Sequence, residues 1–278
     1  MNLTSINKLK EIFSEKHPSK KLGQNFLIDE DVINVLTSTS QLNSTDTVLE
    51  IGPGLGAITK ELAKKVKRIK AVEKDKFLAE KLKNNLNNDN VEVINKDFLN
   101  LNLNDFLPVN YKVVSNLPFS VTTPIIRKLL SENPTPKLIS LIVQKEVAER
   151  IVATEEKHNF LSVLIHFKAT PKIITKVSRN SFWPAPKVDA AILKLTPHNK
   201  FPEDTSFYNK FFKVVEAGFL HPRKQIKNNL SYLPNYSKEE IKKVLDRLSI
   251  DYRKRPEKIS LKNWVALANQ FDFKTKNK

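Results

Sequence analysis

The sequence predicts an α/β protein built on a parallel sheet, with a small helical C-terminal domain. Three observations carry this prediction: short apolar runs alternate with helical segments as far as residue 143, two more strand-like runs follow, and such runs stop near residue 201. Strands and helices alternating at this pace are typical of βαβ units, which form parallel sheets. With 278 residues, the chain can form one large and one small domain.

The apolar runs predict each element in turn. Buried strands are expected at residues 47–51, 69–73, 91–94, 111–115 and 138–143. An antiparallel addition to the sheet edge is expected at residues 172–177 and 188–195. Helical spacing predicts a helix from an N-cap at Asp29 to about Ser40, and others at residues 58–67, 77–86 and 161–168. We therefore expect a basic N-terminal arm at 1–21, an α/β domain at 22–198 and a helical domain at 199–278.

Composition excludes several classes of protein. The chain has no cysteine, which excludes disulfides, thiolate metal sites and a cysteine nucleophile. Its five histidines form no H-x-x-x-H pair, so no metal site is expected. No apolar run is long enough for a membrane span, and the first 21 residues do not resemble a secretory signal. We expect a cytoplasmic, monomeric protein.

The net charge of +17 indicates a polyanionic partner. Part of this excess is the lysine bias that an AT-rich genome produces, so its position is better evidence than its total. Residues 218–278 carry 15 basic and six acidic residues and hold four of the eight arginines. A phosphate-binding face is therefore predicted around Arg223, Lys224 and Lys227, together with residues 253–255. Arg223 and Lys227 are expected to share one helix face because they lie four residues apart.

A glycine-rich turn follows the first predicted strand. Gly52, Gly54 and Gly56 lie where a strand passes into a helix, so the backbone can turn tightly and approach a ligand. Glu73 and Asp97 end the next two strand units, where nucleoside-binding α/β proteins place acceptors for ribose hydroxyls. The glycine pattern alone also fits a dinucleotide fingerprint or a turn without a ligand.

The segment from Asn116 to Phe119 follows the fourth strand directly. Asn116 offers an amide acceptor, and Pro118 keeps Leu117 extended so that its carbonyl can point outward. Phe119 offers a flat apolar face. Two acceptors beside a stacking surface suit a planar base with an exocyclic amine, although a plain turn with a buried Phe remains an alternative.

Four motifs in this order resemble the ribosomal RNA adenine dimethyltransferases. They are GQNFL at residues 23–27, EIGPGLG at 50–56, NLPF at 116–119 and FWPAPKVD at 182–189. The resemblance covers about residues 18–260 and implies a Rossmann-like, S-adenosylmethionine (SAM) dependent methyltransferase fold. It further implies that residues 22–198 bind SAM and that residues 199–278 bind RNA.

The resemblance also implies roles for individual residues. SAM would be held by residues from five segments: Asn25, Leu27, Gly52, Gly54, Glu73, Asp97 and Asn116. Glu73 would take the ribose hydroxyls and Asp97 the adenine amine of SAM. The implied substrate is a pair of adjacent adenosines near the 3′ end of small-subunit (16S) ribosomal RNA in the immature subunit. Each adenosine would receive two methyl groups.

These residues predict a methyl transfer that needs neither a metal ion nor a covalent intermediate. Asn116 and the Leu117 carbonyl would hold the amine hydrogens, which is positioning rather than base catalysis. Phe119 would stack on the flipped base, and Phe182 is the candidate for the opposite face. The family usually has Tyr at the position of Phe119, and Phe keeps the stacking surface.

Three alternatives differ in what they predict. A macrolide-resistance (Erm-type) methyltransferase shares the fold and chemistry but modifies large-subunit RNA. A non-catalytic nucleic-acid-binding relative would have lost the set formed by Gly52, Glu73, Asp97 and Asn116, which is intact here. A nicotinamide oxidoreductase would need an acid or base at a hydride site, and none is identifiable.

Overall fold

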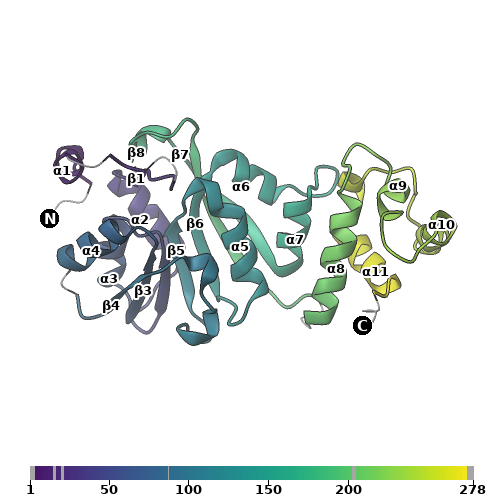
Figure 1. Ribbon diagram of the computed structural model, residues 1–278, viewed down its shortest axis with the longest axis horizontal. Helices are drawn as coiled ribbons and strands as arrows, with labels where there is room; N and C mark the ends of the chain where they lie inside the picture. The colour runs from purple at the N-terminus through teal and green to yellow at the C-terminus, as the bar shows by residue number, and fades with distance from the viewer. Residues whose placement is uncertain (1–3, 15–16, 20–21, 87, 202–204, 274–278) are drawn as a thin grey trace. The chain divides into compact units, whose positions relative to one another are not determined.

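The computed structural model describes residues 4–14, 17–19, 22–86, 88–201 and 205–273 (Figure 1). Its contacts divide the chain into two compact units. The sheet unit comprises Met1–Glu149 and Pro171–Pro197, and the helical unit comprises Arg150–Thr170 and His198–Lys278. The helical unit thus takes in residues 150–170, which the sequence analysis assigned to the α/β domain, and its second segment starts at His198, one residue before the expected start at 199.

The sheet unit is built on a seven-stranded mixed sheet with the order β4-β3-β2-β5-β6-β9-β7. Its strands are β2 (Thr47–Ile51), β3 (Arg68–Glu73), β4 (Val91–Asn95), β5 (Lys112–Asn116), β6 (Leu138–Gln144), β7 (Ala169–Val177) and β9 (Ala190–Pro197). Strands β4, β3, β2, β5 and β6 are parallel neighbours, whereas β9 pairs antiparallel with β6. The predicted parallel sheet with an antiparallel addition is thus confirmed.

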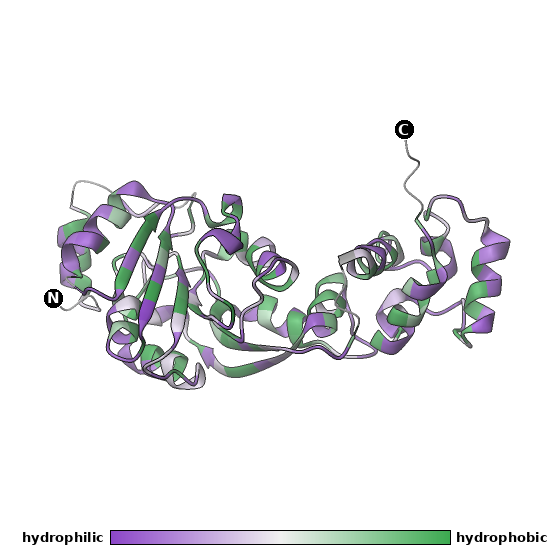
Figure 2. Ribbon diagram, turned by 90° about the horizontal axis from the view of Figure 1, so that it is seen from below, coloured by the Kyte–Doolittle hydropathy of each residue, from purple (hydrophilic) through white to green (hydrophobic). Residues whose placement is uncertain are grey.

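Helices cover both faces of this sheet, with α2, α3 and α4 on one side and α5 on the other (Figure 1). They are α2 (Glu30–Thr39), α3 (Ala57–Ala63), α4 (Lys76–Asn85), α5 (Thr122–Ser131) and α6 (Lys145–Val152). Strands and helices both carry hydrophilic and hydrophobic residues (Figure 2). The parallel strands β2, β3, β5 and β6 are buried along most of their length, whereas the edge strand β4 is partly exposed.

The local signals for helix α2 act as predicted. The Asp29 carboxylate accepts the backbone N–H groups of Asp31 and Val32 at 3.1 and 3.2 Å, so it is the N-cap. Ile33 and Leu36 point into the core. Two predictions were less accurate: α3 ends at Ala63 rather than near residue 67, and α5 and α6 were not predicted at all.

The N-terminal segment, expected only as a basic arm, contains helix α1 (Ile6–Ile12) packed on the sheet unit. Leu9 and Phe13 are buried at its inner side. The Phe13 ring lies 5.1 Å from that of Phe26, 6.1 Å from Phe77 and 5.9 Å from Trp183. Phe26 and Trp183 come from the short antiparallel pair β1 (Phe26–Leu27) and β8 (Phe182–Trp183). The described part of this segment is therefore a structural element of the site region.

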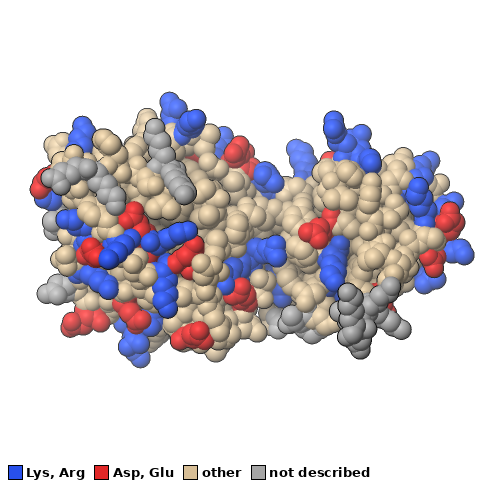
Figure 3. All heavy atoms as spheres, viewed as in Figure 1, with Lys and Arg blue, Asp and Glu red and all other residues tan. Residues whose placement is uncertain are grey.

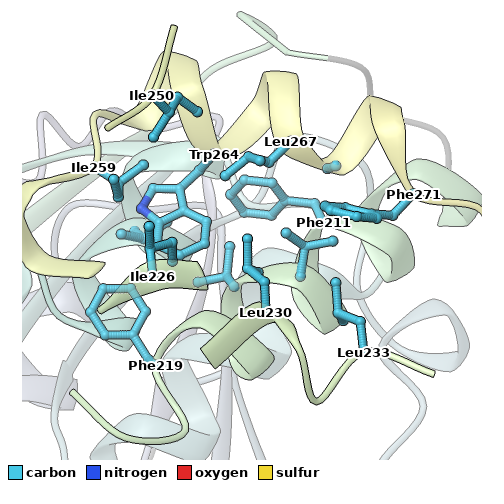
Figure 4. Close-up of a cluster of buried hydrophobic side chains, with 14 of the residues drawn as sticks. Phe211, Phe219, Ile226, Leu230, Leu233, Ile250, Ile259, Trp264, Leu267 and Phe271 are labelled. Atoms are coloured by element: carbon cyan, nitrogen blue, oxygen red, sulfur yellow. The ribbon is translucent and has the colours of Figure 1, made fainter. Parts of the chain in front are cut away.

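The helical unit encloses a core of its own (Figure 4). Its helices are α7 (Phe160–Lys168), α8 (Thr205–Gly218), α9 (Ile226–Leu230), α10 (Lys238–Arg247) and α11 (Leu261–Gln270). Trp264 is fully buried and stacks on Phe219 at 5.4 Å. Gly218 makes room for it, because a Cβ there would lie 2.2 Å from the Trp264 ring. Helix α7 belongs to this unit because Val163 and Phe167 are part of its core.

The described residues were also searched for membrane-spanning helices and for metal-binding clusters. Every helix in the described ranges is too short or too polar to cross a membrane. Within the same ranges, no cluster of three or more His, Asp or Glu side chains is arranged to hold a metal ion.

We expect Phe13→Ala to detach α1 and to destabilise the sheet unit by about 3 kcal/mol, the low end for a buried Phe, because the helix can undock instead of leaving a cavity. Trp183 provides the signal, since it contacts Phe13 whereas Trp264 is buried in the other unit. Chemical denaturation followed by tryptophan fluorescence should show red-shifted native emission and an earlier transition. Ile6→Ala, on the same helix but 41% exposed, is the control. Equal stability of both variants would contradict the packing role.

Candidate active site

Four predicted residues meet at the carboxyl edge of the parallel sheet. Glu73 and Asn116 are the last residues of β3 and β5, Gly52 follows β2, and Asp97 lies two residues beyond β4. These strands are adjacent and parallel in the order β4-β3-β2-β5, so their carboxyl ends form one row. Ligands bind at this edge in open α/β sheets.

A cavity of about 280 Å³ opens at this edge. The predicted residues that line it are Asn25, Leu27, Gly52, Gly54, Glu73, Asp97, Asn116, Leu117, Pro118 and Phe119. Sequence reasoning missed Leu9, Phe26, Phe98, Leu99 and Ile125, which line it too. The apolar pair directly after Asp97 was an available signal for two of them, whereas nothing in the sequence singled out Leu9.

The glycine turn needs left-handed backbone, with φ of 67° at Gly52 and 60° at Gly54. A Cβ at Gly54 would lie 3.2 Å from the Phe26 ring, and one at Gly52 would lie 3.4 Å from Pro118. Other residues rarely adopt this conformation and would crowd the cavity wall. The glycines therefore keep the floor of the cavity free of side chains.

The Glu73 carboxylate fixes the position of this turn. Its Oε2 accepts the Gly54 N–H at 3.0 Å, and its Oε1 accepts the Asp75 N–H at 2.9 Å. Burial raises the pKa of Glu73, and the backbone N–H groups of Asp75 and Gly54 oppose that rise. Each carboxylate oxygen retains a second lone pair, so Glu73 can still accept a ligand hydroxyl.

A second carboxyl group lies beneath the turn. Glu50 is 1% exposed, and neither of its oxygens has a hydrogen-bond partner of normal geometry among the described residues. Burial raises the pKa of Glu50 to about 8, while the nearby Thr59 hydroxyl lowers it and Glu73 raises it further. Glu50 is therefore protonated at neutral pH. The sequence analysis quoted this residue as part of a motif but gave it no role.

Asp97 lies in a more open part of the same row. Its Oδ2 accepts from Lys74 Nζ at 2.7 Å and its Oδ1 accepts the Leu99 N–H at 3.0 Å. The Lys74 ammonium lowers the pKa of Asp97, and the Leu99 amide adds to that effect. Asp97 is thus a fixed negative charge at the rim of the cavity.

Asn116 presents a buried acceptor to the cavity. Its Nδ2 donates to the Asn25 carbonyl at 3.1 Å, which orients the amide group. Its Oδ1 is buried and has no hydrogen-bond partner among the described residues. Leaving such an atom unpaired costs about 1–3 kcal/mol, so its orientation points to a ligand donor.

Leu117 and Phe119 follow Asn116 at the wall of the cavity. The Leu117 N–H donates to Ile142 at 3.2 Å, whereas no hydrogen bond from a described residue reaches the Leu117 carbonyl. Phe119 is half-buried and begins a short 3₁₀ turn (Phe119–Val121) on the cavity wall. Phe119 thus lines the cavity beside Asn116, whereas the outward Leu117 carbonyl stays a prediction, because Leu117 is only 1% exposed.

Phe182 does not take the place that the sequence analysis gave it. Its ring is 2% exposed, belongs to the core and is absent from the cavity lining. It meets Phe119 edge-on at 6.4 Å, because β8 pairs with β1 and turns the side chain inward. In this structure Phe182 supports Phe119 from behind and has no face open to a base.

The predicted basic face lies in the helical unit, and two loops form it. The Ile226 N–H donates to the Lys254 carbonyl at 2.7 Å, and the Lys227 N–H donates to the Tyr252 carbonyl at 3.4 Å. The start of helix α9 therefore lies beside residues 252–254. The visible surface of this unit carries many more Lys and Arg than acidic side chains (Figure 3). Arg223 and Lys224 are exposed, and neither forms an ion pair with a described residue.

Three details of this face differ from expectation. Arg223 does not share a helix face with Lys227, because α9 begins only at Ile226 and Arg223 lies in the preceding turn. Lys227 is half-buried with its ammonium 4.6 Å from the centre of the Tyr252 ring. Arg253 forms an ion pair with Asp251 at 3.1 Å. The free cations are thus fewer than the sequence suggests.

Comparison with known proteins places this site in a family. A family model described as ribosomal RNA adenine dimethylase matches residues 16–272. A protein named ribosomal RNA small subunit methyltransferase A from Clostridium botulinum (strain Kyoto) is 39% identical over 256 residues, covering 90% of this chain and 93% of the relative. One of the same name from Clostridioides difficile (strain 630) is 35% identical over 288 residues and covers 99% of both.

The chain belongs to the ribosomal RNA adenine dimethylase family. Solved structures agree on the fold of this adenine dimethylase. A dimethyladenosine transferase from Plasmodium falciparum is similar with a TM-score of 0.77 and 23% identity, covering 88% of this chain and 97% of the other. The 23S rRNA methyltransferase ErmE has a TM-score of 0.69 and 28% identity, covering 88% and 99%. The Rossmann-like methyltransferase fold with a helical C-terminal region is thus confirmed.

The site of this adenine dimethylase fits the cofactor that a methyltransferase implies. Left-handed glycine backbone leaves the cavity floor open, and the Asn116 Oδ1 atom is buried there without a partner. Carboxylates at two strand ends match the hydroxyl and amine donors of a nucleoside. The donor set therefore suits SAM.

We expect Glu50→Gln to change how the stability of this adenine dimethylase depends on pH. The folded chain keeps the Glu50 proton up to about pH 8, whereas the unfolded chain releases it near the ordinary value of 4.5. The unfolded state then binds fewer protons, so the parent loses stability as pH rises from 4.5 to 8. Gln does not titrate and removes this loss. Urea denaturation near pH 5 and pH 8 measures it.

The exposed Glu80→Gln is the matched control for that series. Glu50→Gln should gain stability relative to the parent as pH rises, while Glu80→Gln should follow the parent. Parallel pH profiles for all three proteins would show that Glu50 is ionised in the folded state.

Proposed function

We propose that this protein transfers methyl groups from SAM to the exocyclic amines of two adjacent adenosines near the 3′ end of small-subunit ribosomal RNA, two methyl groups to each. Its partner is then the ribosomal RNA of an immature small subunit. Family membership and the name of the curated relatives support this reaction and substrate. The observation that carries the chemistry is the buried, unpartnered Oδ1 atom of Asn116 at the cavity wall.

The row of residues at the strand ends would hold SAM, which supplies an electrophilic methyl group when bound. Glu73 would accept the ribose hydroxyls with the lone pairs that its two backbone donors leave free. Asp97 would accept the adenine amine of the cofactor. Gly52, Gly54, Asn25, Leu27 and Asn116 would complete the cavity wall around it.

The target amine would be held by two acceptors of this chain. Asn116 Oδ1 and the Leu117 carbonyl would each accept one amine hydrogen, which aims the nitrogen lone pair into the cavity. The Asn25 carbonyl keeps the Asn116 amide in this orientation through Nδ2. Such preorganised groups act in the transition state without a general base, and the released proton can pass to water.

The Phe119 ring would receive the target base after it leaves its stack. Extruding a base costs a few kcal/mol, and stacking on an aromatic ring returns about 1–3 kcal/mol per base. Phe182 meets the Phe119 ring edge-on at 6.4 Å and would keep it in place. This assigns Phe182 an indirect part, in place of the direct contact that the sequence suggested.

Mapping methyl groups on ribosomal RNA tests the proposal. The protein, labelled SAM and immature small subunits from an unmethylated source are incubated together, and the RNA is digested and analysed by mass spectrometry. We expect dimethyladenosine at two adjacent positions of the small-subunit RNA. Label on large-subunit RNA would favour the reaction of the structurally similar ErmE, and no label with intact SAM binding would favour a non-catalytic role.

We expect Asn116→Ala to lower turnover by about 10²–10³, the range measured for loss of one preorganised polar group. Single-turnover methylation measures the rate, and calorimetry measures SAM affinity. Asn104→Ala, on the same unit but outside the cavity lining, is the control and should match the parent. Near-normal turnover with unchanged SAM affinity would remove Asn116 from the reaction.

Replacing Arg223 and Lys224 together by Ala should weaken RNA binding and flatten its salt dependence. Each lost phosphate contact reduces the slope by about 0.7–0.9, so the pair should reduce it by about 1.4–1.8. Lys227 is left intact because its ammonium packs on Tyr252. The exposed lysines Lys67 and Lys83 of the sheet unit, replaced together, form the control. An unchanged slope in the Arg223 and Lys224 variant would reduce this face to solvated surface.

A further inference from the structure

An exposed aromatic residue, Tyr232, lies near the turn that carries Arg223 and Lys224. Tyr232 is 54% exposed, and it is the only aromatic among the large hydrophobic residues that are exposed in the described part of the chain. Its ring lies 5.4 Å from that of His221 at an angle of 59°. Neither the core of this unit nor the proposed active site uses the open face of this ring.

The buried residue Asn229 holds the backbone of both His221 and Tyr232 in place. Asn229 is fully buried; its Oδ1 accepts the His221 N–H at 3.1 Å and its Nδ2 donates to the His221 carbonyl at 3.0 Å. The Tyr232 N–H donates to the Asn229 carbonyl at 3.2 Å. The Asn229 side chain thus positions the His221 backbone, and the Asn229 backbone carbonyl positions that of Tyr232. A ligand would bind to this site without having to order it, which favours affinity.

The cations belong to the same turn as one of the rings. The Lys224 N–H donates to the His221 carbonyl at 2.9 Å, so residues 221–224 form a tight turn. Arg223 and Lys224 extend from this turn, exposed and without ion-pair partners among the described residues. A flat apolar face next to unpaired positive charges is complementary to a nucleotide, with its base on the ring and its phosphates on the cations.

We propose that His221 and Tyr232 form a subsite for an unpaired base of RNA, whose flanking phosphates contact Arg223 and Lys224. This inference rests on the proposed function and adds a second single-stranded contact, separate from the target adenosine. The base must be unpaired, because bases inside a duplex are stacked on their neighbours and offer no free face. Stacking accepts every base, so this subsite selects strand state and not sequence.

Binding of a labelled oligoribonucleotide to the full-length protein tests the subsite. The probe is a single-stranded oligomer of about 12 nucleotides with 2-aminopurine at its centre, and its perfect duplex serves as the paired form. Tyr232→Ala should weaken single-strand binding about 5- to 100-fold, the range for loss of one stacked base. The salt slope should stay that of the parent, and duplex affinity should not change. The 2-aminopurine quenching seen with the parent should disappear.

Three further variants define the contact. Tyr232→Phe should bind as the parent does, and Tyr232→Leu should lose affinity although it keeps an apolar surface. Asn228→Ala, an exposed change on the helix that precedes Tyr232, should have no effect. Equal loss on single strand and duplex, or full binding by Tyr232→Leu, would overturn the stacking subsite. The latter result would indicate an apolar docking surface for another protein. Unchanged thermal midpoints exclude misfolding at this exposed position.

The result is independent of the test of the proposed function. If the parent methylates ribosomal RNA but Tyr232→Ala binds the single strand normally, the subsite is wrong and the proposed function stands. If the parent fails to methylate while Tyr232→Ala loses the single-strand contact, the proposed function is wrong and the subsite stands.

Discussion

The hydrogen bond from the Gly54 N–H to the Glu73 carboxylate is the constraint on which the site depends. It joins the turn after β2 to the end of β3 at 3.0 Å, inside a region where Glu73 is only 7% exposed. If the turn moved, the buried Glu73 carboxyl group would lose one of its two backbone donors and keep an unsatisfied oxygen. The same contact requires left-handed backbone at Gly54. Gly54 and the acid 19 residues later, Glu73, therefore depend on each other to form this contact.

The titratable groups around that contact are differentiated by their surroundings. Glu50 has no hydrogen-bond partner of normal geometry among the described residues and keeps its proton, whereas burial raises the pKa of Glu73 against two amide donors that favour its charged form. Asp97 is charged because Lys74 lies beside it. Three acids close together thus do not repel as three full charges would. The cavity receives carboxylate acceptors at two fixed strand ends, which suits a nucleoside ligand, while the third carboxyl stays neutral beneath the turn.

An element of this structure could be predicted when it leaves a local pattern in the sequence. Strand positions and the residues after them could be predicted, because a buried parallel strand is an apolar run and its end is marked by Gly52, Glu73 or Asn116. Helix α1 could not, since only Leu9 and Phe13 of the described residues 4–14 are buried, with polar residues between them.

Side-chain direction was equally hidden from sequence reasoning. The Phe182 side chain points inward because strand β8 pairs with strand β1. Each of these strands has two residues, and they lie about 150 positions apart along the chain. The helix face expected for Arg223 and Lys227 failed because helix α9 begins after Arg223. Long-range pairing and the start of a short helix leave little local pattern, which is why these two expectations differ from the structure.

The charge of +17 separates into two physical roles once the structure is known. Long-range attraction of a polyanion depends on the total and is insensitive to where each lysine lies. Orientation depends on cations that are free and fixed, and the ring contact of Lys227 and the ion pair of Arg253 remove two residues that sequence alone would include. Four of the six predicted cations remain exposed without an ion pair to a described residue: Arg223 and Lys224, on a turn that Asn229 holds in place, and Lys254 and Arg255. The buried Asn229 amide therefore does for the RNA face what Glu73 does for the cofactor turn: it fixes backbone so that binding does not have to.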